Sequence, residues 1–234
     1  MTNNPLSKKL FSTLPLAAVV AIFSLSAVAA PVGTLVVSPC AGNGATITAT
    51  TIDFGPTQCI ETSAGTSVTS SFGTLLPGVS GLVTDLNLGV LPVNLFMSFN
   101  PGGGVLNFIL TQVGPGQGAT NCALVNPCSA TPTSPITLVQ VGSNVTGILP
   151  VKGTVTDANG TSNWSGQFSA DFTNTTTAAI QAVFTAGGGA SITTGYSGRL
   201  DVVIAPTVPE PGSLATFGIG AVLIGLGAIR RRKA

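Results

Sequence analysis

The sequence contains no histidine and few charged side chains. The first feature argues against histidine-dependent catalysis and the second against nucleic-acid binding. Without histidine there is no Ser-His-Asp or Cys-His catalytic arrangement, and the cysteine spacing lacks the paired short intervals of a structural zinc site. Only 6% of the residues are charged, against about 25% in an ordinary soluble domain. From residue 30 to 208 the only cations are Lys152 and Arg199, so this part has no basic surface for nucleic acid.

Catalytic motifs are missing as well. The chain has no Gly-x-Ser-x-Gly elbow and no phosphate-binding glycine loop with a lysine. Asp157, Asp171 and Asp201 remain as candidates for the paired carboxylates of a sugar hydrolase. Nothing in the pattern pairs them, and an aspartate in a turn or on a wet strand face needs no such role. We therefore expect that the protein is not an enzyme and needs no cofactor or metal.

The amino-terminal segment has the three parts of a secretory signal peptide. In chain order these are the cations Lys8 and Lys9, the apolar residues 14–28, and the small residues Ala27 and Ala29 of a cleavage site. Cleavage after Ala29 is favoured because a cut one bond later would place Pro31 directly after the scissile peptide. We expect a signal-peptide helix within residues 1–29 that is removed on export.

The carboxyl-terminal segment joins an apolar stretch to a basic cluster. Residues 214–229 are apolar and are followed at once by Arg230, Arg231, Arg232 and Lys233. Because positive residues resist translocation, we expect a transmembrane helix with this cluster in the cytoplasm and the body in the periplasm. Such a helix would reach about 24 Å, which is short of the ~30 Å hydrocarbon core. The stretch is therefore a marginal permanent anchor, as a processing signal would be.

A Pro-Glu-Pro triplet precedes this stretch. Pro209 and Pro211 fix φ and lack backbone N–H groups, so the triplet should stay extended and accessible to an enzyme. The order Pro209-Glu210-Pro211, short glycine-rich apolar helix and arginine cluster resembles the PEP-CTERM sorting domain, over residues 208–234. The resemblance implies that exosortase, an integral membrane enzyme of Gram-negative bacteria, handles this tail at the inner membrane. It also implies a final location at the cell surface or in the extracellular matrix.

We assign residues 206–234 to this sorting signal and residues 30–205 to one exported all-β domain. Alternation of apolar and polar side chains predicts strands at 145–155, 162–173, 180–184 and 191–204. Trp164 and Tyr196 fall on the apolar faces, so we expect both in the core. Less regular alternation predicts further strands at 32–37, 45–54, 82–90, 94–99 and 105–113.

Turn-forming residues separate these strands. In the second half they lie at 157–160, 174–177 and 187–189. The first of these turns lacks the third oxygen ligand and the distal glutamate of a calcium loop, so a hairpin turn is favoured. Short strands with glycine-rich turns favour an antiparallel β-sandwich of jelly-roll or Greek-key type. A parallel β-helix is the alternative, and the lack of a fixed repeat counts against it.

The four cysteines of an exported chain favour disulfides. Cys122 and Cys128 flank Asn126 and Pro127, where a turn brings them together, and closing this loop contributes about 2 kcal/mol. Cys40 and Cys59 flank the predicted strand 45–54, which would extend about 33 Å, so both connecting loops would have to run back along it. We therefore favour the pair Cys122–Cys128 over the pair Cys40–Cys59.

Two functions remain for the exported domain. A sheet protein of low charge, faced with threonine, serine, asparagine and glycine, interacts through hydrogen bonds and responds little to salt. This favours a structural or adhesive component of the cell surface or matrix, and the PEP-CTERM resemblance implies the same, because such proteins tend to accompany exopolysaccharide and biofilm. The alternative is a carbohydrate-binding module with a ligand site on loops at one end. A secreted glycan-acting enzyme is the least favoured.

Overall fold

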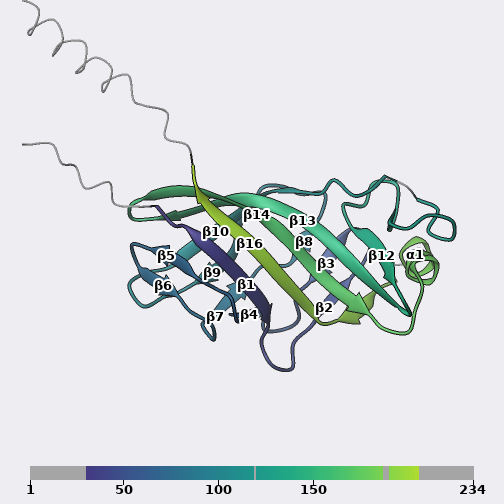
Figure 1. Ribbon diagram of the computed structural model, residues 1–234, viewed down its shortest axis with the longest axis horizontal. Coiled ribbons are helices and arrows are strands. Elements are labelled where there is room, and N and C mark those ends of the chain that lie inside the picture. Colours follow the sequence, from purple (N-terminus) through teal and green to yellow (C-terminus); the bar gives the residue numbers. More distant parts are fainter. Residues whose placement is uncertain (1–29, 119, 187–189, 206–234) are drawn as a thin grey trace, which may run out of the picture.

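The computed structural model describes residues 30–118, 120–186 and 190–205 (Figure 1). The predicted signal peptide, the sorting signal and the two flanking helices lie outside these residues, as does the predicted turn at 187–189. Among the described residues, no helix is both long and apolar enough to cross a membrane.

The described residues form short and long strands and one helix. The strands are β1 (Gly33–Pro39), β2 (Ala45–Ile47), β3 (Thr51–Asp53), β4 (Cys59–Thr62), β5 (Val68–Ser70), β6 (Gly73–Leu75), β7 (Ser80–Val83), β8 (Leu86–Asn87), β9 (Val93–Phe99), β10 (Leu106–Val113), β11 (Cys128–Ser129), β12 (Thr137–Val141), β13 (Asn144–Asp157), β14 (Gly160–Phe172), β15 (Ile192–Thr194) and β16 (Tyr196–Ile204). The helix is α1 (Thr177–Thr185).

Eight strands close into an antiparallel barrel. Their order is β10-β9-β7-β4-β1-β16-β14-β13, and β13 pairs again with β10 to complete the ring. Residues 151–156 of β13 make this closing pairing, whereas residues 144–148 of the same strand pair with β12. The long strand β13 therefore belongs to the barrel in its second half and to an extension of the sheet in its first.

The predicted all-β antiparallel class is confirmed, and the predicted two-sheet sandwich is corrected to a closed barrel with additional sheets. The parallel β-helix is wrong because the strand pairings are antiparallel. Alternation along a strand is the same in a sandwich and in a barrel, so it cannot distinguish them. What distinguishes them is the β10–β13 pairing, which joins distant parts of the chain.

Aromatic side chains fill the barrel above glycines of neighbouring strands. Trp164 on β14 is 1% exposed and lies opposite Gly153 on β13. A Cβ atom at Gly153 would lie 2.8 Å from the Trp164 ring, so the ring occupies the space that the glycine leaves. Phe168 lies in the same way opposite Gly198 on β16. These pairs explain how a narrow barrel holds large rings at interior packing density.

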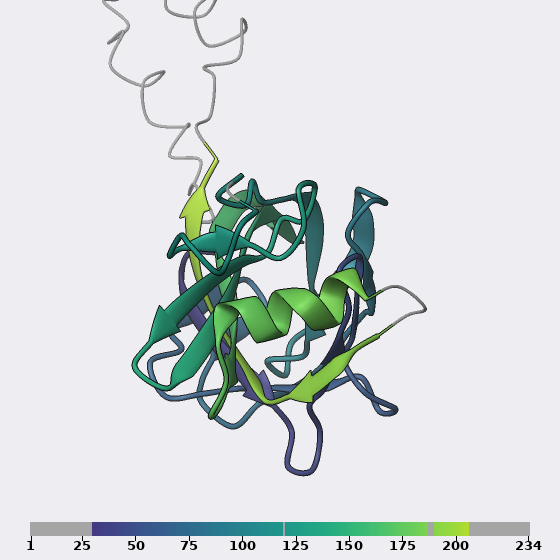
Figure 2. The same ribbon diagram turned by 90° about the vertical axis from the view of Figure 1, so that its right-hand side faces the viewer.

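Smaller elements cover the two ends of the barrel. The β5–β6 hairpin, which we call the plug, buries Val68 and Leu75 and forms an isolated bridge from Thr69 to Val32, the residue before β1. At the other end a four-stranded sheet, ordered β15-β2-β3-β8, packs its apolar face against the barrel wall. Figure 1 shows the plug on the left and α1 on the right, and Figure 2 looks onto the α1 end. The barrel interior is therefore packed rather than open.

Two predicted strands are each divided into two shorter strands. The prediction at 45–54 becomes the β2–β3 hairpin, because the Thr48 hydroxyl accepts the N–H groups of Thr50 and Thr51 and turns the chain. The prediction at 82–90 becomes β7 in the barrel and β8 in the small sheet. Asp85 lies between β7 and β8 and accepts the N–H of Phe54. This hydrogen bond attaches the connection between the two strands to the small sheet.

Two further predictions in the second half need correction. The predicted strand at 180–184 is helix α1, in which Ile180 and Phe184 lie one turn apart and are both buried. The helix begins after Thr176, whose side chain accepts the N–H of Ala179 as an N-cap. The predicted strand 191–204 changes sheet at Gly195, so that β15 belongs to the small sheet and β16 to the barrel.

Candidate functional site

Both terminal segments join the barrel at one end. Strand β1 begins beside the end of β16, with Gly33 opposite Val202, and Ala30 lies beside Gly160 of the β13–β14 turn. We call this the tail end and the opposite end, with α1 and the four-stranded sheet, the far end (Figure 1). Strand β16 is paired on both sides, with β1 and with β14. The segment after residue 205 therefore leaves from a strand held firmly within the wall.

Asp157 fastens the plug at the tail end. One carboxylate oxygen accepts the N–H of Ser71 in the plug at 2.6 Å, and the other accepts the N–H groups of Asn159 and Gly160 in its own turn. Burial of the carboxyl acts to raise its pKa, but the hydrogen bonds from Ser71, Asn159 and Gly160 outweigh it and lower the pKa of Asp157 below its ordinary value. The ionised form of Asp157 therefore holds the plug.

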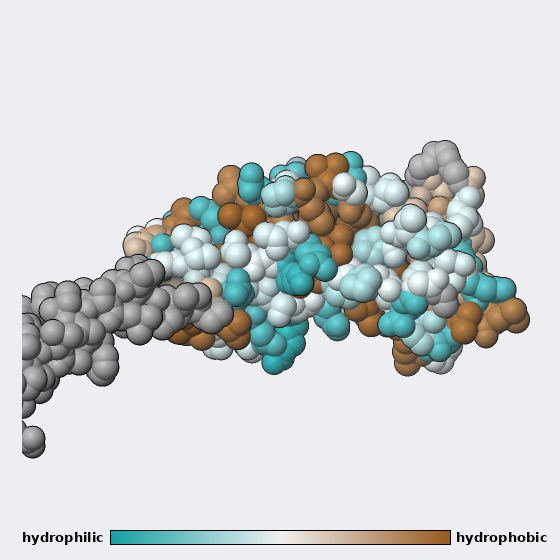
Figure 3. All heavy atoms as spheres, turned by 90° about the horizontal axis from the view of Figure 1, so that it is seen from above, coloured by the Kyte–Doolittle hydropathy of each residue, from teal (hydrophilic) through white to brown (hydrophobic). Residues whose placement is uncertain are grey.

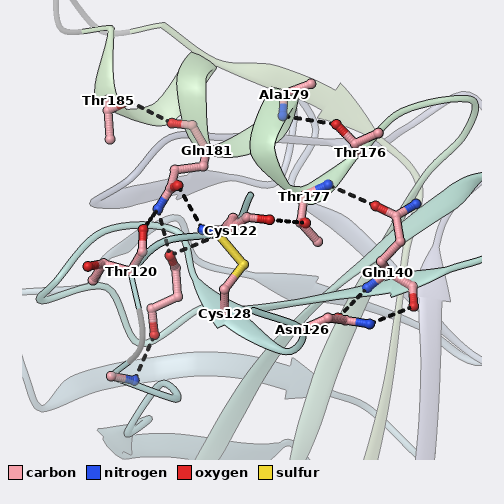
Figure 4. The surroundings of a disulfide bond; sticks show 12 residues. Thr120, Cys122, Asn126, Cys128, Gln140, Thr176, Thr177, Ala179, Gln181 and Thr185 are labelled. Carbon is pink, nitrogen blue, oxygen red and sulfur yellow. Dashed lines mark hydrogen bonds between the residues drawn. A yellow bond between two sulfur atoms is a disulfide. The ribbon is translucent and has the colours of Figure 1, made fainter. Parts of the chain in front are cut away.

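A disulfide and a hydrogen-bond network attach α1 to the far end (Figure 4). Gln181 on α1 accepts the N–H of Cys122 at 3.2 Å and donates to the carbonyl of Thr120. Thr177, at the start of α1, donates its hydroxyl to the carbonyl of Cys122 at 3.0 Å. The segment around the Cys122–Cys128 disulfide thus supplies donors and acceptors that match the polar side chains of one helix.

Gln140 on β12 extends this network. Its side-chain oxygen accepts the N–H of Thr177, and its side-chain nitrogen donates to the carbonyls of Gly142, Asn144 and Thr175. The side chain of Asn126 pairs with the backbone of Gln140 in both directions. The arrangement holds backbone groups in place, which is a structural task.

Both candidate disulfides form. The Cα atoms of Cys122 and Cys128 are 5.3 Å apart, as favoured from the sequence. The Cα atoms of Cys40 and Cys59 are 5.5 Å apart, so this second candidate pair also forms and the geometric objection to it does not hold. The objection rested on a straight strand at 45–54, and the β2–β3 hairpin removes it by returning the chain toward its starting point.

The three candidate catalytic aspartates do not meet. Asp157 and Asp171 lie near opposite ends of the β13–β14 pair, and Asp171 is opposite Thr146, about 35 Å along β13 from Asp157. Asp201 is opposite Ser165, roughly 20 Å along β14 from Asp171. Paired carboxylates of sugar hydrolases lie about 5–9.5 Å apart. Within the described ranges, no three Asp, Glu or Cys residues gather to hold a metal ion.

The tryptophan and the tyrosine lie in the core, as predicted. Trp164 donates its indole N–H to the carbonyl of Thr154, and Tyr196 is 8% exposed with its ring 5.1 Å from that of Phe54. Burial raises the pKa of Tyr196 to about 12. Its hydroxyl has no hydrogen-bond partner among the described residues, and the ring lines an apolar cavity of about 30 Å³. Neither aromatic side chain is available as a surface platform for a sugar.

The described ranges thus form an all-β body whose two terminal segments adjoin at one end. Residues 207–233 match the family described as the PEP-CTERM protein-sorting motif. This match contains Pro209, Glu210 and Pro211 as well as the basic residues Arg230, Arg231, Arg232 and Lys233. No curated protein sequence and no solved structure matches the chain.

The motif indicates an exported protein that is sorted by exosortase. The match covers the tail and not the barrel. The predicted cleavage after Ala29, with Ala27 and Ala29 as the small residues of the site, lies outside both the match and the described residues and stays a prediction.

Several residues that organise the ends of the barrel were not predicted from the sequence. They are Ser71, Asp85, Gln140, Thr177 and Gln181. Their partners are backbone groups distant in the chain, so no local spacing marks them. Thr176 is the exception, because a threonine before Ile180 and Phe184 at helical spacing is a recognisable N-cap signal.

Proposed function

We propose that the barrel is a structural or adhesive component of the cell surface or extracellular matrix. The supporting observation is the make-up of its outer wall, in which neighbouring strands are joined by hydroxyl pairs. Between strands these pairs include Thr156 with Thr161 and Ser169 with Ser197, and Ser38 on β1 pairs in the same way with Ser63 directly after β4. Seen from above, polar and apolar residues are interleaved over the surface (Figure 3). Such a wall interacts through hydrogen bonds and apolar contacts rather than through charge.

The position of the tail indicates how the barrel is oriented relative to the inner membrane before processing. Three residues, 206–208, separate Ala205 from Pro209, so the Pro-Glu-Pro triplet begins within about 15 Å of the barrel at full extension. Before processing, the tail end therefore faces the inner membrane and the far end faces away from it. In this proposal residues 214–229 occupy the membrane only transiently, the basic cluster stays cytoplasmic, and exosortase releases the body to the surface.

The mature body contains all the elements that form and cover the barrel. The barrel closes and both of its ends are covered within residues 30–205. No catalytic step forms part of the proposal, since the aspartates that would supply one are separated along the wall. Exopolysaccharide is a proposed partner, because a hydroxyl-rich wall suits a hydroxyl-rich polymer.

The test is extraction of intact cells that produce the full chain. If hydrogen bonds and apolar contacts hold the body in the matrix, washing in about 1 M salt, where the Debye length is ~3 Å, should leave it in the cell-associated fraction. A mild denaturant or detergent should release it. Release by salt alone, or a body found free in the medium under all conditions, contradicts a matrix role.

A carbohydrate-binding function is the second candidate. It is favoured by one observation, an amphipathic groove on the outer wall of the barrel.

A further inference from the structure

The groove lies between the plug and three neighbouring strands of the barrel and has a volume of about 500 Å³. This falls in the usual range for small-molecule sites, about 300–1,000 Å³. Its polar side chains come from strands β9, β10 and β13, and its apolar side chains come from β9, β10, the plug and the residues next to β10 and β13. The lining residues that the argument uses are Asn94, Leu95, Asn107, Thr156, Phe72 and Val105. We call it the outer groove.

A strained bend in β9 presents two side chains to the outer groove. Leu95 has a φ of 58°, and it is the one non-glycine residue within a described strand to have a positive φ. The pairing of β9 with β10 shifts register at this point, between Phe108 and Leu110. Bulges of this kind re-aim side chains, and the left-handed region is unfavourable for a leucine. Core packing does not explain the strain, because Leu95 remains 57% exposed.

The lining of the outer groove offers a ligand no cation and one carboxylate that is already hydrogen-bonded. Its single charged side chain is Asp157, whose two oxygens already accept backbone N–H groups from Ser71, Asn159 and Gly160. Lys152 lies about 13 Å away along β13 from Thr156. An anionic ligand would meet the negative charge of Asp157, and a cationic ligand would meet a carboxylate that is only 8% exposed and already hydrogen-bonded, so either would lose hydration without a well-matched ionic partner. The site therefore favours an uncharged occupant.

Two side-chain amides add hydrogen-bonding capacity between the apolar groups. Asn94 is exposed and Asn107 is half-buried, so both amides keep donors and acceptors toward the groove. Val105 is 47% exposed beside them. Apolar patches alternating with amides suit a ligand that has apolar C–H faces and a rim of hydroxyl groups.

A peptide strand does not fit this position. Strand β10 is paired with β9 on one edge and with β13 on the other, so the groove has no free backbone edge for strand addition. We propose that the outer groove binds a neutral carbohydrate chain, with pyranose faces on Phe72, Leu95 and Val105 and sugar hydroxyls on Asn94 and Asn107. This inference rests on the surface location proposed above and names a ligand class for the carbohydrate-binding candidate.

The test uses the mature chain, residues 30–205, on an array of neutral hexose and N-acetylhexosamine oligomers that also carries uronate oligomers. We expect saturable binding to one or more neutral oligomers and none to the uronates. The variant Asn94→Ala/Asn107→Ala loses two amide contacts, which should weaken binding about tenfold or more. A matched control is Gln167→Ala, which removes an exposed amide elsewhere on the outer wall, opposite Pro150 on β13.

Thermal unfolding of each variant separates loss of binding from loss of fold, and we expect unchanged midpoints because these amides project from the wall. The inference is overturned if no neutral oligomer binds, if uronates bind instead, or if the double variant binds as tightly as the unaltered chain. Cell fractionation tests the proposed surface location independently of glycan binding. A body found in the matrix that binds no neutral glycan would therefore refute the groove and leave the matrix role standing.

Discussion

At the scale of single residues, the fold depends on polar side chains that serve distant backbone groups. Asp157 shows this most clearly, since it closes its own hairpin and also holds the plug through Ser71. The sequence predicted the turn correctly from Asp157 and Gly160. It did not predict the second task, because Ser71 lies far away in the chain and no spacing connects the two.

We predict that Asp157→Asn lowers the free energy of unfolding at neutral pH by about 1–3 kcal/mol. The amide keeps one oxygen for the turn but places a donor against the N–H of Ser71. The unaltered protein should lose stability as pH falls, because a depressed native pKa stabilises the fold above the ordinary value of 3.8 and that stability disappears as the carboxyl is protonated. Denaturant unfolding from neutral to acid pH measures both effects.

Asp53→Asn is the control for this change. Asp53 is exposed and accepts a hydrogen bond from Gly55 within its own loop, so we expect a change within about 0.5 kcal/mol. Equal stability of the Asp157→Asn variant and the unaltered protein at neutral pH would show that the plug is not held by the carboxylate.

At the scale of elements, the sequence was informative where alternation is long and unbroken. Strands β13, β14 and β16 were predicted from it, together with the burial of Trp164. Helix α1 was missed because Ile180, Ala182 and Phe184 fit a period of two, although Ile180 and Phe184 also fit one helical turn. The β2–β3 turn was missed because threonines make it, without the usual glycine or asparagine.

Helix α1 depends on the segment closed by the Cys122–Cys128 disulfide. We predict that Cys122→Ala/Cys128→Ala lowers stability by about 2 kcal/mol and speeds amide hydrogen exchange in α1, because Gln181 and Thr177 both bond to the backbone of Cys122. Exchange in the barrel strands β13 and β14 should stay slow. Hydrogen exchange followed by mass spectrometry measures this.

The Cys40→Ala/Cys59→Ala variant provides the comparison. This disulfide joins the ends of β1 and β4, so its loss should act on the barrel wall and leave α1 exchange unchanged. If both variants have the same exchange pattern in α1, the helix is not fastened through Cys122.

At the scale of the whole molecule, the sorting motif in the tail could be predicted from the sequence, whereas the closure of the barrel could not. The order of the Pro-Glu-Pro triplet, apolar stretch and basic cluster is a local pattern, and it was sufficient to predict the sorting motif now matched over residues 207–233. Closure of the barrel is a long-range event that depends on β10 meeting β13, so the sequence reached the all-β class but not the barrel. The outer groove arises from the same closure and could not be predicted either.

The central claim is that this chain is exported and then processed through its tail, leaving the barrel as the mature protein. Intact-mass measurement of the chain extracted from the cell surface tests it most directly. We predict an amino terminus at Ala30, a carboxyl terminus within or next to residues 209–211, and no chain that retains residues 214–233. Recovery of surface protein that still carries the apolar stretch and Arg230 to Lys233 would contradict processing and leave a simple membrane anchor.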